Sequence, residues 1–166
     1  MSKHILNEGI HSLNAYMTIA DAPAAIEFYK KAFGARELIR MPTPDGKIMH
    51  ASLVIGDSCL MITEEAPEWG ALGPRARGGS SVSINLQVPN VDEVFARAIA
   101  CGATVKMPVA DMFWGDRFGM LTDPFGHEWS IATHIKDMTA EEMLEAGKQA
   151  MANMAGGPDC AGGQQG

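Results

Sequence analysis

The chain has 166 residues, of which 46% are hydrophobic and 20% are charged, as expected for one soluble globular domain. This composition excludes wholesale disorder, collagen and coiled coil, and no apolar run approaches a membrane span. The formal net charge of −7 argues against phosphate-backbone and anionic-lipid partners. We therefore expect no nucleic acid and no membrane partner. Because the first eight residues contain no apolar signal core, we expect a cytoplasmic protein.

The first half of the chain predicts the element order β-α-β-β-β over residues 13–64, after an N-terminal arm at 1–12. Asp21 is a suitable N-cap for the helix, and Pro23 fits its first turn. Gly34 supplies the stop. Hydrophobic alternation and turn residues predict strands at 13–19, 36–41, 48–55 and 59–64.

The second half repeats this order over residues 81–134. Asn90 caps the second helix, and Gly102-Ala103 at its end matches Gly34-Ala35 of the first half. Strands are predicted at 82–88, 105–110, 117–122 and 128–133. A repeat of this kind implies a duplicated module and a pseudo-twofold axis. We therefore predict an α+β fold, in which two tandem β-α-β-β-β modules form curved sheets around a cleft.

Three segments lie outside the modules. Residues 65–80 are rich in Gly and Pro and form a linker, in which we expect Trp69 to pack locally, with a lid over a pocket as the alternative. Thr139 and Glu142 form a capping box that opens a C-terminal helix over 139–154. The Gly-rich residues 155–166 are expected to be a disordered tail.

Few residues offer recognisable chemistry. No glycine fingerprint for dinucleotides, phosphate-binding loop or nucleophile elbow is present. His50 lies in the middle of a strand, from which it can point into a cleft. Trp114 can stack on a ligand while Arg117 holds an anion. The alternative is a surface pair of Asp116 and Arg117, with Trp114 packed at the sheet edge.

Two motifs carry a family resemblance. The first opens at Asp21 and contains Phe28-Tyr29-Lys30-Lys31-Ala32-Phe33-Gly34-Ala35. The second contains Trp114-Gly115-Asp116-Arg117 and then Asp123-Pro124-Phe125-Gly126-His127-Glu128-Trp129. With the doubled module, they resemble the vicinal oxygen chelate superfamily of glyoxalases, bleomycin-resistance proteins and extradiol dioxygenases, and within it the PhnB-like branch. The resemblance covers residues 13–154 and implies a homodimer.

The resemblance also implies where metal-dependent members place their ligands. Those positions fall on Asn14, Ile62, Ser83 and Ser130. Divalent metals favour imidazole and carboxylate ligands, which none of these four residues provides. We therefore expect no metal and no cofactor. A methyltransferase is not expected, because no glycine-rich loop for S-adenosylmethionine follows the first strand.

Two functions remain open. The first is a metal-free protein that binds a small molecule in the cleft of the paired modules. Its expected ligand-binding residues are Asn14, His50, Ile62, Ser83, Trp114, Arg117 and Ser130. The alternative is a glyoxalase-like metal-dependent lyase or isomerase with a shifted ligand set drawn from His50, Glu64 and His134. Catalytic residues are not assigned in either case.

Overall fold

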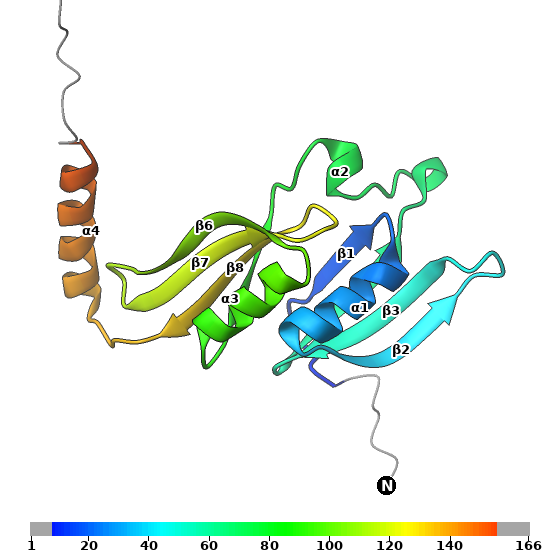
Figure 1. The fold of residues 1–166 in the computed structure, drawn as a ribbon, viewed down its shortest axis with the longest axis horizontal. Helices are drawn as coiled ribbons and strands as arrows, with labels where there is room; N and C mark the ends of the chain where they lie inside the picture. The colour runs from blue at the N-terminus through cyan, green and yellow to red at the C-terminus, as the bar shows by residue number, and fades with distance from the viewer. Residues whose placement is uncertain (1–7, 156–166) are drawn as a thin grey trace, which may run out of the picture.

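The computed structural model describes residues 8–155, which form two modules side by side and a C-terminal helix (Figure 1). The first module comprises β1 (Ala15–Ile19), α1 (Ala22–Phe33), β2 (Arg36–Pro42), β3 (Ile48–Ile55) and β4 (Ser58–Glu64). The second comprises β5 (Ser83–Gln87), α3 (Val91–Ala100), β6 (Thr104–Asp111), β7 (Asp116–Thr122) and β8 (Glu128–His134). Helix α4 spans Ala140–Ala155. The predicted fold of two β-α-β-β-β modules with an added helix is confirmed.

Each module builds one four-stranded sheet, with strand order β1-β4-β3-β2 in the first and β5-β8-β7-β6 in the second. The first strand of each module runs parallel to the last, and the remaining neighbours are antiparallel. Helices α1 and α3 pack against each other, and both lie in front of their sheets in Figure 1. Each sheet therefore has one face covered by helices and one face turned to the opposite side.

Local sequence explains both helices. The side chain of Asp21 accepts a hydrogen bond from the Ala24 backbone N–H, and that of Asn90 accepts one from Glu93. Gly34 ends α1 in the left-handed conformation at φ 70°. Apolar side chains then repeat along one face of each helix and pack on the sheet.

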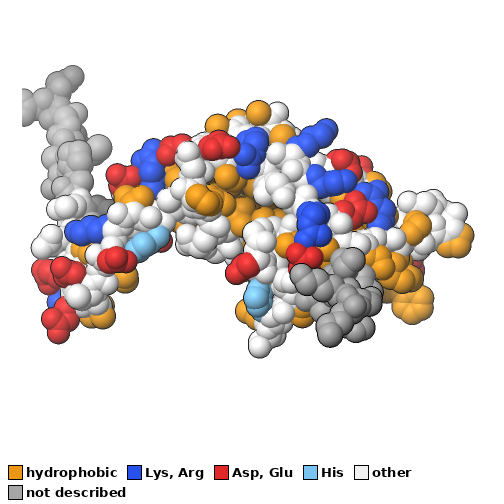
Figure 2. All heavy atoms as spheres, turned by 90° about the horizontal axis from the view of Figure 1, so that it is seen from below, with side chains coloured by type: hydrophobic (Ala, Val, Ile, Leu, Met, Phe, Trp, Pro, Cys, Tyr) orange, Lys and Arg blue, Asp and Glu red, His pale blue; other side chains and the backbone are white. Residues whose placement is uncertain are grey.

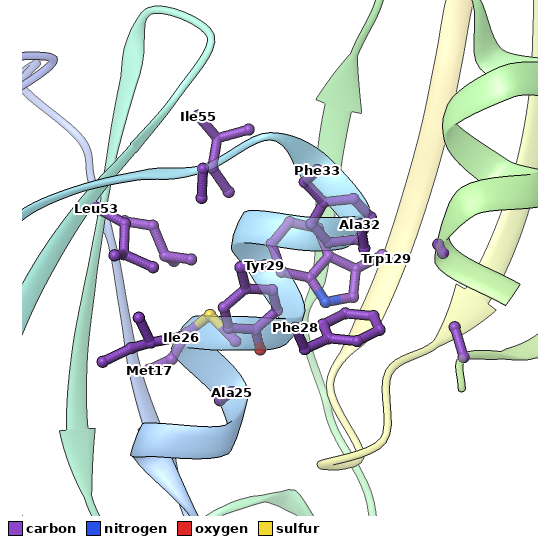
Figure 3. Packing of buried hydrophobic residues seen from close by; sticks show 14 of the residues in the cluster. Met17, Ala25, Ile26, Phe28, Tyr29, Ala32, Phe33, Leu53, Ile55 and Trp129 are labelled. Atoms are coloured by element: carbon purple, nitrogen blue, oxygen red, sulfur yellow. The ribbon is translucent and has the colours of Figure 1, made fainter. Parts of the chain in front are cut away.

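The core continues from one module into the other. In Figure 3, Phe28, Tyr29 and Phe33 of α1 gather around Trp129 of β8. The ring centroids of Phe33 and Trp129 lie 4.6 Å apart, and the Trp129 side chain is fully buried. Trp129 therefore faces the helices. Because this core crosses the boundary between the modules, it fixes their relative position.

The linker differs from the expectation. Residues 65–80 contain a single 3₁₀ turn, η2 (Pro67–Trp69), and the short helix α2 (Pro74–Arg77). Trp69 is 85% exposed, so the prediction that it packs locally is wrong. The turn that carries Trp69 is closed by its own backbone, with a pair of hydrogen bonds between Ala66 and Ala71. It therefore needs no core contact from the indole.

The C-terminal helix is found where the capping box predicts it. Thr139 and Glu142 exchange hydrogen bonds between side chains and backbone N–H groups. The predicted disordered tail falls almost wholly at 156–166, outside the described residues. Within residues 8–155, the longest helices are too short or too polar to cross a membrane.

Candidate functional site

The faces of the two sheets that the helices leave uncovered, here called the open faces, carry most of the polar strand residues. Cross-strand register defines matching rows on them. In the first module one row contains Tyr16, Met61 and Ser52. In the second, Asn85 and Ser130 occupy the positions of Tyr16 and Met61. Because alternate strand residues share a face, the neighbours of these residues turn into the core.

The second open face presents a strip of neutral hydrogen-bonding groups. Asn85 donates from Nδ2 to Ser130 Oγ at 3.0 Å. Gln87 donates from Nε2 to the side-chain oxygen Oδ1 of Asn85 at 3.4 Å. Ser83 lies on the same face of β5 and is exposed. The structure therefore places the predicted Ser83 and Ser130 on one sheet face, where Ser83 is exposed and Ser130 is buried. Asn85 was missed by sequence reasoning, although its place two residues after Ser83 in a strand is the signal that would have identified it.

The first open face holds a hydrogen-bonded chain of three side chains. The Tyr16 hydroxyl lies 3.3 Å from His50 Nδ1, and His50 Nε2 lies 3.0 Å from Ser52 Oγ. The two aromatic rings meet edge to face at 5.7 Å. Tyr16 is 58% exposed and Ser52 is buried. His50 is therefore held in one orientation from both sides.

One predicted position is wrong by one residue. Ile62 pairs with Met17 and Ala51 and lies in the buried core on the helix side. Strand pairing instead matches Met61 to Ser130. Met61 pairs with Tyr16, two residues after Asn14, and Ser130 pairs with Asn85, two residues after Ser83. A one-residue shift exchanges the two faces of a strand. Met61, not Ile62, is therefore the open-face residue of β4.

The residues at the four matched positions do not fit a divalent metal. They are Asn14, Met61, Ser83 and Ser130, which supply an amide, a thioether and two hydroxyls. Catalytic zinc and related ions are held by imidazole, carboxylate or thiolate. Across residues 8–155, moreover, no three His, Cys, Asp or Glu side chains are grouped closely enough to hold an ion.

The shifted ligand set is not brought together either. His50 belongs to the first module, with both ring nitrogens in the hydrogen bonds described above. His134, in the second, has its ring nitrogens 2.9 Å from carboxylate oxygens of Asp116 and Asp137. These carboxylates raise the pKa of His134. Glu64 accepts a hydrogen bond from the Ile48 backbone N–H. Each of the three is thus engaged within its own module.

Asn14 serves the backbone that leads into β1. Its side chain accepts a hydrogen bond from the His11 N–H and donates one to the His11 carbonyl. The His11 ring in turn lies 3.0 Å from the Asp57 carbonyl oxygen. Asn14 therefore closes a turn that anchors the chain entering β1 to the β3–β4 hairpin.

Arg117 lies on the covered face of β7, whereas Trp114 packs beside Phe118, which lies on the open face in the row of Gln87. The indole of Trp114 donates to Asp116 at 3.2 Å and packs edge-on against Phe118. Arg117 forms ion pairs with Asp92 and Asp111 at 2.7 and 2.8 Å, and these hydrogen bonds raise its pKa further. The predicted alternative of an Arg117 pair with Asp116 is therefore wrong in its partner. Asp92 is reached because it lies in the first turn of α3, on the covered side of β7.

A buried carboxylate joins the modules. Asp123 Oδ2 accepts hydrogen bonds from the Tyr29 hydroxyl at 2.7 Å and from Trp129 Nε1 at 2.9 Å. Its Oδ1 accepts from the backbone N–H groups of Phe125 and His127. Burial, with the nearby Asp123 charge, raises the pKa of Tyr29 well above its ordinary value. The motif residues that carry the family resemblance thus hold the two modules together.

Next to this junction lies the largest described cavity, of about 710 Å³. In Figure 2 hydrophobic side chains gather in the hollow between the modules. Phe33, Leu60, Val94 and Trp129 contribute to its apolar walls, and Arg97 is its cation. This volume lies within the range usual for small-molecule sites.

The fold agrees with comparisons to known proteins. The family model described as Glyoxalase/Bleomycin resistance protein/Dioxygenase superfamily matches residues 9–131. An uncharacterized protein of Mycobacterium bovis is 41% identical over 138 residues, 81% of this chain and 91% of that protein. TioX from Micromonospora sp. ML1 has a TM-score of 0.61 and 28% identity, covering 76% of this chain and all of TioX.

A PhnB protein from Bacillus cereus shares the fold, with a TM-score of 0.59 and 17% identity, covering 74% of this chain and 99% of its own. The expected resemblance to the superfamily is confirmed by the family model. The chain belongs to the glyoxalase/bleomycin resistance protein/dioxygenase superfamily.

Proposed function

We propose that this protein binds a small organic molecule on its open faces without a metal. The observation that carries the proposal is the replacement of the metal-ligand positions by Asn14, Met61, Ser83 and Ser130. Three of these side chains form hydrogen bonds but are weak ligands for a divalent ion, and the thioether is a soft ligand. A protein that keeps the paired modules but lacks the metal ligands still retains a surface on which a small molecule can bind.

The polar groups on the open faces suggest which ligand features are recognised. Asn85, Gln87 and Ser130 offer both donors and acceptors, and none of them carries a charge. Tyr16 adds an exposed ring whose hydroxyl is oriented by His50. These groups suit a ligand that has carbonyl, amide or hydroxyl groups beside an apolar or aromatic part.

Metal content of the purified protein is the first test. The protein is grown with added zinc, nickel and iron, dialysed, and assayed by elemental analysis. We expect less than one tenth of a metal ion per chain. Stoichiometric metal that is lost in Asn14→Ala or Ser130→Ala would overturn the proposal.

Ligand binding is the second test, by a thermal-shift screen of small metabolites. For any compound that raises Tm, Asn85→Leu is expected to weaken binding about tenfold, as suits the loss of one or two hydrogen bonds. Lys148→Met on α4 is the matched surface control. Equal loss of affinity in both variants, or in neither, would contradict binding on the open faces.

We also propose a homodimer in which a second copy covers part of the open side. Tyr16 and Met41, both on the open face of the first module, are 58% and 40% exposed. Exposed apolar side chains grouped on a sheet face are typical of interfaces. The family to which the chain belongs supports this proposal, and its test is given below.

A further inference from the structure

The interface between the two modules has two ends, which the pseudo-twofold axis relates to each other. The side chains at matched positions of these two ends differ. Leu60 and Trp129 match because each lies opposite the corresponding first-strand residue, Ala15 or Ile84. Tyr29 and Ala98 match because each lies eight residues after its helix N-cap. The large aromatic residues at one end therefore correspond to a leucine and an alanine at the other.

The β3–β4 and β7–β8 hairpins differ in the same way, because the aromatic side chain again lies at the end that contains Tyr29 and Trp129. Asp123 matches Ile55, since each lies two residues after the strand residue that pairs with Trp129 or Leu60. Beyond Asp123 the hairpin contains Phe125, whose ring lies 6.2 Å from Phe28 and 6.5 Å from Tyr29. The first-module hairpin contains only Gly56 and Asp57 between its strands. No aromatic ring is supplied from that side.

The cavity of about 710 Å³ is lined by Ile55, Leu60 and Val94 of this less filled end, and the Trp129 side chain lines it from the other. Smaller side chains at matched positions fill less of the space between the modules. The ring of Phe125 shows what such a space accommodates at the opposite end. The broken symmetry therefore indicates room for a planar apolar group of about that size.

The same comparison of matched positions indicates where the polar group of a bound ligand would lie. Arg97 lies seven residues after its N-cap, as does Phe28 in α1, so a guanidinium replaces the phenyl group that contacts Phe125. Arg97 donates from Nε to the Ala32 carbonyl at 3.0 Å and from Nη1 to Glu93 at 2.9 Å. These bonds hold the half-buried guanidinium at the wall of the cavity. Such a fixed cation recognises a carboxylate.

We propose that this cavity binds a small aromatic carboxylate, with its ring against Phe33 and Trp129 and its carboxylate at Arg97. No predicted ligand residue other than Asn14 lines it. Asn85 and Gln87 of the second open face also line this cavity. The proposal goes beyond the proposed function in assigning a carboxylate to Arg97, which that function does not use.

Calorimetric titration of the full chain with 2-naphthoate and with neutral 2-naphthamide tests the proposal. The acid is expected to bind at least tenfold more tightly than the amide, as suits one charge-assisted hydrogen bond. Arg97→Met is expected to abolish this preference, and Lys148→Met to keep it. Equal binding of acid and amide to the unaltered chain would overturn the role of Arg97.

Asp57→Phe places a ring in the short hairpin and is expected to weaken binding of both probes at least tenfold. A measurement on the unaltered protein needs no variant to fold: the indole N–H resonance of Trp129 is expected to shift on addition of 2-naphthoate. An unshifted resonance with no saturable binding at millimolar probe would overturn the proposal. Because neither Arg97 nor the preference for acid over amide enters the metal and open-face tests, either proposal can fail alone.

Discussion

At the scale of single residues, the clearest feature is that Asp123 satisfies four donors drawn from both modules. A buried carboxylate is stable only when it is well hydrogen-bonded. Two of these donors come from the backbone of its own hairpin, and the Trp129 and Tyr29 side chains supply the others. The aspartate thus shapes the hairpin and links it to α1.

Tyr29→Phe tests that link. The substitution keeps the ring and removes one donor to buried Asp123, so we expect a loss of about 1–3 kcal/mol in the free energy of unfolding. For a chain of this size that corresponds to roughly 2–4 °C in Tm per kcal/mol. Tyr16→Phe, which removes an exposed hydroxyl, is the matched control and is expected to change Tm less. Equal losses of Tm in the two variants would show that the hydrogen bond between Tyr29 and Asp123 does not stabilise the fold.

The two histidines of the second module have pKa values shifted in opposite directions. Hydrogen bonds to Asp116 and Asp137 raise that of exposed His134. Burial lowers that of His127, and the Asp123 charge and the Thr18 carbonyl partly oppose the effect. Proton resonances of the rings, followed by NMR, are therefore expected to titrate above the usual value of about 6.5 for His134 and below it for His127.

The sign of the effect on stability follows for His134. Its folded pKa lies above the unfolded one, so its contribution is fully present below about pH 6.5 and is lost as pH rises through the folded pKa. His134→Gln is expected to lower Tm more at pH 5.5 than at pH 8.5. A Tm difference between variant and parent that is the same at both pH values would contradict this assignment.

At the scale of elements, the chain leading into α4 makes a close backbone-to-backbone approach, and α4 itself lies against Phe113 at Gly147. Gly115 lies at φ 94°, and its carbonyl accepts hydrogen bonds from Ile135 and Lys136. A Cβ at this position would overlap the Lys136 carbonyl oxygen. The chain between β8 and α4 therefore lies against the β6–β7 turn because residue 115 has no side chain.

Gly115→Ala is expected to destabilise the protein by more than the roughly 1 kcal/mol typical of alanine in a left-handed conformation. Gly46→Ala is the matched control, because Gly46 has φ 85° and open space around it. We expect faster amide exchange in α4 only for the Gly115 variant, measured by hydrogen–deuterium exchange. The same Tm loss and the same exchange in both would show that backbone conformation alone is responsible.

Sequence reasoning identified the elements well because their signals are local. The N-caps Asp21 and Asn90 and the alternating strands predict the module order directly, and the register of β8 follows from its hairpin. The prediction for Ile62 failed because β4 carries apolar residues on both faces, so its sequence does not show which of them turn into the core. Sequence reasoning also assigned no structural role to Asp123, since Tyr29 lies 94 residues away and the contact depends on how the modules meet.

At the scale of the whole molecule, the proposed homodimer determines whether the open faces stay exposed. Light scattering at micromolar concentration is expected to give twice the chain mass of 17.7 kDa. Met41→Lys, on the open face of β2, is expected to shift the protein toward monomer, because a charge in an apolar interface is costly. Lys148→Glu is the surface control. A mass near 17.7 kDa for the unaltered chain would count against the dimer.

The unequal ends of the module junction also bear on how such a chain evolves. A symmetric pair of separate single modules, encoded by one gene, would carry every substitution twice, at both ends of its interface. Filling one end with Tyr29, Asp123 and Trp129 would then fill the other identically. Covalent fusion of two copies removes that constraint, because each half can change alone. Here one end of the junction is filled by Tyr29, Asp123 and Trp129, and the matched end carries smaller side chains and Arg97, so the two copies of one contact are free to serve different purposes.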